Sequence, residues 1–403
     1  MGWPGRSTAL AAVAGTALAV VSGAAGWGTA HRLLAAVALP PLAALVTTAW
    51  VTARRLLAPS VAALILFGAA AVLIGRDVHL VFATLAFTAA VYATALAFRR
   101  SITVPEAQQL TNDNIYRSAT LTDYVTLTKP RIMSLLLLTG GAGAFVGAGG
   151  APAWGAFAAT MIGLALACGG ASALNHYLDR DIDRMMGSRT ESRPVASGRL
   201  APTRALEFGL ALSAGSFVLL DALVNLPTAL LALAGNLFYV LVYTRWLKRS
   251  TPRNIVIGGA AGAVPPLVGF AGATGHLGWA ALAMFAIVFV WTPPHFWALA
   301  LMLREHYARA GVPMLPVTRG DRATARQILG YTVVLVAVTL APAAFGMFGA
   351  LYVVAALLLG GVFAWYALAL QRSLSRAASA KLFHYSLLYL ALLFVAMALD
   401  TVV

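Results

Sequence analysis

Apolar segments long enough to cross a lipid bilayer recur along the whole of this 403-residue chain. A spanning helix needs roughly 20 apolar residues, and in lipid the backbone must satisfy its own hydrogen bonds, which leaves helices and closed barrels. Continuous apolar runs of this length favour helices. About thirteen such runs lie between charged breaks, at 8–27, 33–52, 58–75, 79–97, 132–149, 153–174, 206–224, 226–243, 255–274, 279–301, 327–345, 348–371 and 383–402. The sequence therefore predicts an all-α, polytopic membrane helix bundle.

Charge supports this class and suggests an orientation. Hydrophobic residues make up 61% of the chain and charged residues 10%, against about 25% charged in soluble domains. The net charge of +15 could indicate nucleic-acid binding. With the N-terminus in the cytoplasm, however, all basic residues except Arg32 and Arg76 fall in inner segments, as the positive-inside rule expects. We therefore expect a multi-pass protein of the inner or plasma membrane, surrounded by lipid, with no nucleic-acid partner. The polar loops would be cytoplasmic and the C-terminus outside.

A polar stretch divides the chain. Residues 1–100 hold about four of the predicted spans and form an accessory N-terminal membrane region. Residues 101–131 form a polar cytoplasmic linker and the approach to the first core helix, and 132–403 form a nine-helix core. The first span has some features of a cleaved signal peptide, but its apolar run is long for one.

The acidic segment NHYLDRDIDR holds three of the 13 acidic residues. Asn175, Asp179 and Asp183 are spaced by four, so on a helix they share one face, while Asp181 lies on the opposite face as a solvated or arginine-paired acid. Two carboxylates one turn apart repel each other unless a divalent cation lies between them. Mg²⁺ takes one or two carboxylates and completes its shell with water and phosphate oxygens. The spacing predicts a magnesium–diphosphate site at the cytoplasmic end of a span.

Two further segments carry polar residues suited to chemistry. His295 follows the pair Pro293–Pro294 within an apolar span and has tryptophans close by, which is typical of either a functional residue or a satisfied core histidine. Glu305 and its neighbours then lie at the cytoplasmic exit of that span. Lys248, Arg249 and Arg253 form a basic cluster that could meet phosphate, although the positive-inside bias alone would supply some of these charges.

These motifs resemble the UbiA-type intramembrane prenyltransferases. NHYLDRDIDRMMGSRTESRPVASG is similar to the family's first aspartate motif, and LTKPRI to the approach to its first helix. LKRSTPRNIVIGGAAGAVPP, WTPPHFWALAL and YARAGVPMLPV resemble the branch that farnesylates protoheme. The resemblance covers about 120–403 and implies a nine-helix prenyltransferase core, to which residues 1–100 are an addition.

The resemblance implies an enzyme that transfers farnesyl from farnesyl diphosphate to the 2-vinyl group of heme b, with addition of water, giving heme O. It implies Mg²⁺ as cofactor, heme b as substrate, and a heme A synthase as candidate partner. Transferred by position, the catalytic residues would be Asp179, Asp183 and Glu305. The metal ligands would be Asn175, Asp179, Asp183 and Glu305. The diphosphate contacts would be Lys129, Arg131, Arg193, Lys248 and Arg249, and the heme contacts His295, Trp291 and Tyr307.

One position departs from the family pattern. The second acidic motif usually has two adjacent acids before its tyrosine, and here Glu305 is followed by His306. We therefore expect Glu305 to serve the second metal side alone. Two other functions remain open: prenyl transfer to a quinone or chlorophyll precursor, and a membrane transporter. A transporter would place ionisable residues along a pathway, whereas those found here gather at one membrane face.

Overall fold

The computed structural model describes residues 119–403, and the regular structure within that range is entirely helical. In chain order the elements are α6 (Leu121–Thr128), α7 (Pro130–Ala148), α8 (Trp154–Leu178), α9 (Arg180–Met185), η3 (Gly187–Arg189), α10 (Pro202–Leu223), α11 (Leu226–Leu237), η4 (Phe238–Leu247), α12 (Lys248–Ser250), α13 (Asn254–Thr274), α14 (Trp279–Met302), α15 (Arg304–Arg309), α16 (Leu315–Ala344), α17 (Ala350–Ser373) and α18 (Arg376–Asp400).

The described part of the chain contains nine helices that are long and apolar enough to cross a membrane, with α11, η4 and α12 forming one continuous span. This confirms the predicted integral membrane bundle and its nine-helix core. The predictions for the accessory region, its four spans and most of the polar linker fall on residues 1–118 and lie outside the described residues.

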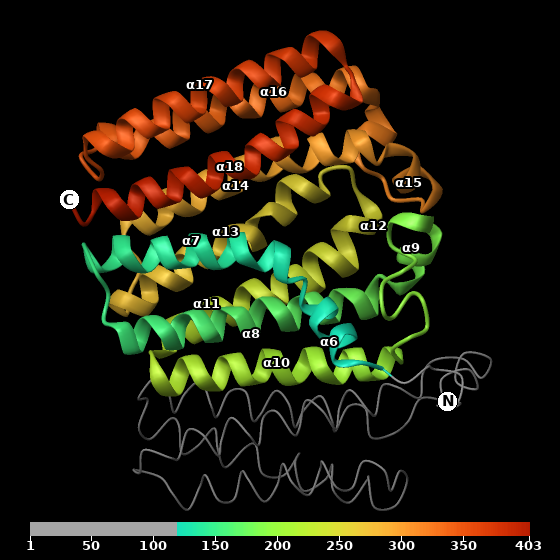
Figure 1. Ribbon diagram of the computed structural model, residues 1–403, viewed down its shortest axis with the longest axis horizontal. Coiled ribbons are helices and arrows are strands. Elements are labelled where there is room, and N and C mark those ends of the chain that lie inside the picture. The colour runs from blue at the N-terminus through green and yellow to red at the C-terminus, as the bar shows by residue number, and fades with distance from the viewer. Residues whose placement is uncertain (1–118) are drawn as a thin grey trace, which may run out of the picture. The chain divides into compact units, whose positions relative to one another are not determined.

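The long helices lie side by side, and the short elements α6, α9, α12 and α15 gather at one end of the bundle (Figure 1). The C-terminus lies at the opposite end. The segments 175–205, 245–253 and 304–326, which the charge pattern assigned to one membrane face, therefore do meet at one end.

Several helices extend further into the polar segments than their apolar runs indicated: α16 begins at Leu315 and not near 327, and α18 begins at Arg376 and not near 383. Two further extensions reach the candidate site. α8 ends at Leu178 and not near 174, and the span that contains α11 ends at Ser250 and not near 243. Hydropathy detects only the part of a helix that faces lipid or apolar neighbours. The extra turns are polar because they carry Asn175 and Lys248 into a buried cluster, described below.

The contact between α7 and α13 depends on glycine. A Cβ built on Gly269 would lie 1.7 Å from the carbonyl oxygen of Gly140, and one on Gly143 would lie 2.3 Å from that of Pro266. Backbones this close exclude any side chain at those positions, which is how small residues bring membrane helices together. The proline pair of α13 does not end that helix, nor does the pair in α14.

The short helix α6 sets the position of the first core helix. Thr120 and Asp123 form a capping box at its N-terminus, and Arg199 bonds Asp123 at 2.9 Å. At its other end, the carbonyl of Leu127 accepts a hydrogen bond from Ser172 of α8 at 2.6 Å. One end of α6 is therefore tied to the segment that follows α9 and the other end to α8 itself, and the residue that follows α6, Lys129, is held beside α8.

Candidate functional site

Asn175, Asp179 and Asp183 lie along one face where α8 meets α9. The backbone N–H of Asp179 donates to Asn175 and that of Asp183 donates to Asp179, each at 2.8 Å, so helical spacing continues across the junction. The three residues are 3%, 0% and 1% exposed, whereas the side chain of Asp181 is 54% exposed. The structure thus separates Asp181 from the other three, as the spacing predicted.

Asp179 accepts from two residues through one oxygen. Its Oδ2 receives a hydrogen bond from the ammonium of Lys248 at 2.5 Å and another from the amide of Asn175 at 2.7 Å. The same amide also donates to Thr244 at 3.1 Å. Oδ1 of Asp179 is buried and accepts no hydrogen bond from the described residues, although Arg249 lies 3.7 Å away.

Asp183, like Asp179, has one oxygen that accepts a hydrogen bond and one that does not. Its Oδ1 accepts from Arg193 at 2.7 Å, and its Oδ2 is buried without a hydrogen-bond donor in the described part of the chain. Burial raises the pKa of this carboxyl, and the charge of Arg193 opposes that rise. Thr190 donates to the backbone carbonyl of Asp183 at 2.7 Å, which folds the segment carrying Arg193 back over α9.

Lys129 joins the cluster from the first core helix. It has a left-handed backbone (φ 51°) at the junction of α6 and α7, a conformation uncommon for residues other than glycine. Its ammonium donates to Oδ1 of Asn175 at 2.8 Å. Burial lowers the pKa of Lys129 to about 7, and the positive charge of Arg193 lowers it further, against the raising effect of Asp179. Arg131, also predicted to bind diphosphate, is exposed in the first turn of α7.

Arg249 is bound to the protein itself. Its guanidinium donates to both oxygens of Asp181, at 2.6 and 2.7 Å, and to the carbonyl of Leu178 at 2.8 Å. The hydrogen bond from Arg249 is the main cause that lowers the pKa of Asp181 to about 2. Asp181 is therefore an arginine-paired acid, and Arg249 holds the end of α8 in addition to any contact with a ligand.

The second motif presents its tyrosine to the cluster. Tyr307 is 6% exposed; burial raises its pKa to about 12, and the charges of Asp179 and Asp183 contribute to that rise. Glu305 lies two residues earlier, on the other side of the short helix, and is exposed. It makes no hydrogen bond within the described residues, so its predicted role as a metal ligand remains a prediction.

The residues present suit a divalent cation whose coordination shell is completed by the substrate. Within the part of the chain that the structure describes, no three His, Cys, Asp or Glu side chains meet closely enough to form a metal cage. The oxygens of Asp179 and Asp183 that accept no hydrogen bond from the described residues nevertheless offer two carboxylate ligands, the number Mg²⁺ takes when phosphate oxygens and waters supply the rest. The sequence analysis did not identify Thr244, which accepts a hydrogen bond from Asn175. Its position one turn before Lys248 on the same helix was the signal that could have identified it.

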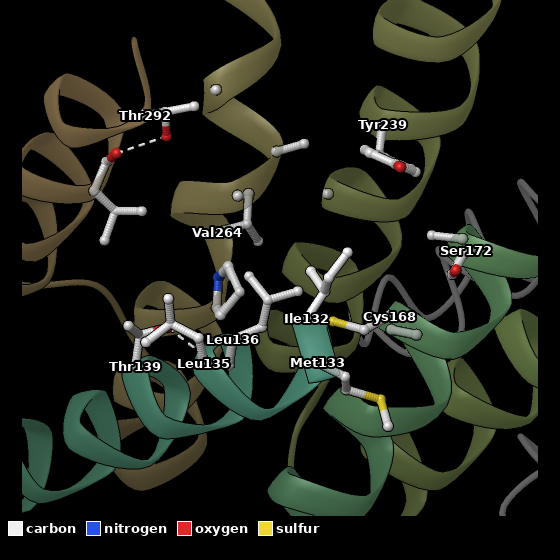
Figure 2. Close-up of a pocket in the computed structure, with 18 of the residues that line it drawn as sticks. Ile132, Met133, Leu135, Leu136, Thr139, Cys168, Ser172, Tyr239, Val264 and Thr292 are labelled. Atoms are coloured by element: carbon white, nitrogen blue, oxygen red, sulfur yellow. Dashed lines mark hydrogen bonds between the residues drawn. The ribbon is translucent and has the colours of Figure 1, made fainter. Parts of the chain in front are cut away.

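An apolar cavity of about 310 Å³ opens next to this cluster, a volume at the lower end for small-molecule sites. Figure 2 shows its wall, formed by Ile132, Leu135 and Leu136 of α7, Cys168 and Ser172 of α8, and by Tyr239, Val264 and Thr292. Lys129 lines it as well, together with three further aromatic side chains, Tyr243, Trp291 and Phe296. The cavity therefore has an apolar, partly aromatic interior, and Lys129 connects it to the charged cluster.

His295 lies one residue layer behind this wall. Its ring stacks on that of Trp291, with centroids 4.3 Å apart, and Trp291 lines the cavity. Nδ1 of His295 lies 2.6 Å from the hydroxyl of Ser386 on α18. The sequence singled out the histidine and the tryptophan but not Ser386, which no local motif connects to them.

Comparison with known proteins assigns the family. The model of the UbiA prenyltransferase family matches residues 136–395, which is more than half of the chain and includes both polar motifs. The chain belongs to the UbiA prenyltransferase family. The resemblance of the sequence motifs to this family is thereby confirmed.

Several similar proteins share one name. The protoheme IX farnesyltransferase of Symbiobacterium thermophilum is 54% identical over 290 residues, covering 72% of this chain and 97% of that protein. That of Gloeobacter violaceus is 51% identical over 289 residues, covering 71% and 93%. That of Roseiflexus castenholzii is 43% identical over 413 residues, covering 95% of this chain and 77% of that protein. Because this last match covers 95% of the chain, it includes most of residues 1–100, which therefore have counterparts in the Roseiflexus castenholzii protein.

Solved UbiA structures share the fold. A digeranylgeranylglyceryl phosphate synthase matches with a TM-score of 0.59 at 18% identity, covering 70% of this chain and 98% of that one. A UbiA homologue from Archaeoglobus fulgidus, bound to GPP and Mg²⁺, matches with a TM-score of 0.52 at 17% identity, covering 68% and 99%. At such low identity these matches show the nine-helix fold alone.

Proposed function

We propose that this chain transfers the farnesyl group of farnesyl diphosphate to the 2-vinyl group of heme b, with addition of water, giving heme O and diphosphate. The structural observation that supports this most is that Asp179 and Asp183 each have one buried oxygen that accepts no hydrogen bond from the described residues. These carboxylates lie among Lys129, Arg193 and Lys248, and Lys129 also lines the apolar cavity. The relatives named protoheme IX farnesyltransferase support the choice of donor and acceptor.

The cations at the rim suit a diphosphate. Lys129, Arg193 and Lys248 each contact the Asn175–Asp179–Asp183 face. Departure of diphosphate from the first carbon of the donor leaves negative charge on the leaving oxygen, and positioned cations stabilise such charge. Mg²⁺ bound by Asp179, Asp183 and Asn175 would add Lewis-acid stabilisation of the same oxygens. Arg249 and Arg131 would complete the basic surroundings. Glu305, which is exposed and whose side chain makes no hydrogen bond within the described residues, would meet the second metal side.

The cavity has the length that a farnesyl chain needs. Lys129 and Thr139 both line it, and ten residues of helix separate them, or about 15 Å along the axis. The farnesyl main chain has about eleven bonds, each adding about 1.2 Å when extended, or about 13 Å in all. The donor thus fits with its diphosphate at Lys129 and its tail among the leucines of α7.

The walls suit the reaction that follows. When the bond from carbon to diphosphate breaks, an allylic cation remains, and it must react with the vinyl group before water reaches it. Tyr239, Tyr243 and Trp291 face the cavity, and aromatic faces attract cations. The vinyl carbon forms the new bond, the positive charge moves to the neighbouring carbon, and water adds there and releases a proton.

The acceptor would lie at the α14 side, in contact with Trp291, His295 and Tyr307. The polar end of the bundle would face the cytoplasm and the C-terminus the outside, as the basic residues indicate. Residues 1–100 would form an accessory membrane region before the linker at 101–131 and the core at 132–403. A heme A synthase is the candidate partner that would take up the product.

The donor and acceptor can be tested together. Purified protein is incubated with Mg²⁺ and either farnesyl or geranylgeranyl diphosphate, with heme b or an aromatic quinone precursor as acceptor, and products are identified by mass. We expect product from farnesyl diphosphate and heme b with the mass of heme O. A prenylated quinone precursor without any heme product would overturn the choice of acceptor.

A further inference from the structure

Two hydrogen bonds at Ser386 determine which nitrogen of His295 carries the proton. The Ser386 hydroxyl lies 2.6 Å from the carbonyl oxygen of Phe383, to which it donates, and 2.6 Å from Nδ1 of His295. A hydroxyl has one proton and a carbonyl can only accept. Since the proton of Ser386 goes to Phe383, the second contact requires that Nδ1–H of His295 donates to the serine oxygen. Nε2 of the neutral ring therefore carries a lone pair.

The ring of His295 is also fixed in orientation. It lies between two aromatic rings, with Trp291 at 4.3 Å and an interplanar angle of 14°, and with Phe383 at 4.8 Å and 23°. Trp291 is itself held by its indole N–H, which donates to the carbonyl of Ser386 at 2.8 Å. The plane of the imidazole and the direction of Nε2 are thus set from both faces and from Nδ1.

Nε2 of His295 is available to a ligand. It makes no hydrogen bond within the described residues, and it is not among the buried side-chain atoms that lack partners. His176 differs, because both of its ring nitrogens are buried and unpartnered. Among the described histidines, His295 thus combines a fixed tautomer, a fixed ring plane and an accessible lone pair.

We propose that Nε2 of His295 is an axial ligand to the iron of the porphyrin acceptor. This inference rests on the proposed function, which supplies an iron porphyrin as substrate. Histidines that bind metals use a neutral ring nitrogen and donate their other N–H to an oxygen, which is the arrangement that Ser386 enforces. Ser386 is accordingly a positioning residue, and Phe383 and Trp291 hold the ring plane.

Iron ligation would select the reacting vinyl group. The iron–nitrogen bond stands roughly perpendicular to the porphyrin plane, so a fixed Nε2 fixes that plane. Trp291, which stacks on His295, also lines the farnesyl cavity, and so does Leu390, one turn after Ser386 on α18. His295 is therefore one aromatic ring away from the cavity, and in this proposal the porphyrin edge nearest the cavity would present the reacting vinyl group.

The test is the absorption and electron paramagnetic resonance spectrum of ferric heme b bound to purified full-length protein. We expect a histidine-ligated spectrum for the wild type and its loss in His295→Phe, which keeps an aromatic ring in the stack. Added imidazole should restore ligation in His295→Gly. His384→Phe is the matched control, since His384 is exposed and bonds only the carbonyl of Ala380 on its own helix; it should keep the wild-type spectrum.

A second comparison does not depend on folding of the histidine variants. Metal-free protoporphyrin IX offers the same ring without iron, so we expect the wild type to bind it at least about tenfold more weakly than ferric heme b. Ser386→Ala should weaken heme binding by about 10- to 100-fold, the range for residues that orient a metal ligand. A wild-type spectrum without histidine ligation, an unchanged spectrum in His295→Phe, or equal affinity for both porphyrins would overturn the inference. Heme O formed despite any of these results would leave the proposed function standing.

Discussion

Lys248 and Asp179 form a buried ion pair although 69 residues separate them in the chain. The side chain of Asp179 is 0% exposed and that of Lys248 is 11% exposed. The pair joins the end of α8 to the end of the span that contains α11, η4 and α12. It holds one carboxylate oxygen of Asp179, while the other accepts no hydrogen bond from the described residues.

Removal of the lysine should destabilise the fold. Lys248→Met leaves the buried charge of Asp179 without its main partner, which typically costs about 3–5 kcal/mol. In the double variant with Asp179→Asn the uncompensated charge is gone, so part of the lost stability should be recovered. Product formation should not be recovered. Thermal unfolding of the detergent-solubilised protein measures this. Arg253→Met, at an exposed position after α12, is the control. If the stability losses of the two single variants simply added up in the double variant, the ion pair between Lys248 and Asp179 would be contradicted.

Product formation should depend on divalent cations. The oxygens of Asp179 and Asp183 that accept no hydrogen bond from the described residues are the metal ligands of the proposal, and diphosphate departs poorly without charge stabilisation. Chelation should abolish heme O formation, and added Mg²⁺ should restore it. The shift in unfolding temperature that farnesyl diphosphate causes should also shrink in the chelated protein. Turnover that continues at an undiminished rate after chelation would refute the metal role.

Cys168 offers a chemical probe of the cavity, because it is the one cysteine of the chain and lies on the cavity wall. Bound farnesyl diphosphate should protect it from a membrane-permeant maleimide, measured as the labelled fraction by intact mass. For the control, cysteine is placed on the outside of α17 by Leu351→Cys, in a Cys168→Ala background. Leu351 is 45% exposed, so its label should be independent of substrate. Equal labelling of Cys168 with and without farnesyl diphosphate would show that the chain binds elsewhere.

The glycine contact between α7 and α13 should be intolerant of a methyl group. Gly269→Ala places a Cβ against the carbonyl of Gly140, and forced separation of packed helices costs typically 1–3 kcal/mol. Gly361→Ala, in α17 with nothing within 4 Å of its Cβ, should instead be neutral or stabilise by up to about 1 kcal/mol. Unfolding temperatures of the two variants provide the comparison. If both variants unfolded at similar temperatures, α7 and α13 would be able to separate without a loss of stability.

Much of this organisation follows from local sequence rules. Apolar run length predicts the nine core spans, and a spacing of four places Asn175, Asp179 and Asp183 on one face, with Asp181 on the other. Those inferences succeed because each depends on residues within a few turns of one helix.

The remaining features depend on contacts between distant segments. Ser386 meets His295 across 91 residues, and no periodicity in either helix encodes that contact. The exposure of Glu305 depends on how the six-residue helix α15 docks, which its sequence alone does not specify. The apolar runs ended α8 and the span that contains α11 and α12 too early, because hydropathy does not register a turn whose charges are paired inside the protein.

The most direct measurement compares heme O formation, by mass spectrometry, in the wild type, Asp179→Asn and Asp181→Asn, each purified and supplied with heme b, farnesyl diphosphate and Mg²⁺. The two aspartates are neighbours in sequence, but one is buried with a free oxygen and the other is exposed and paired with Arg249. We expect product from the wild type and Asp181→Asn, and a loss of about 100-fold or more in Asp179→Asn. Absence of product from the folded wild type, or equal activity in Asp179→Asn, would contradict the assignment of farnesyl transfer to this cluster.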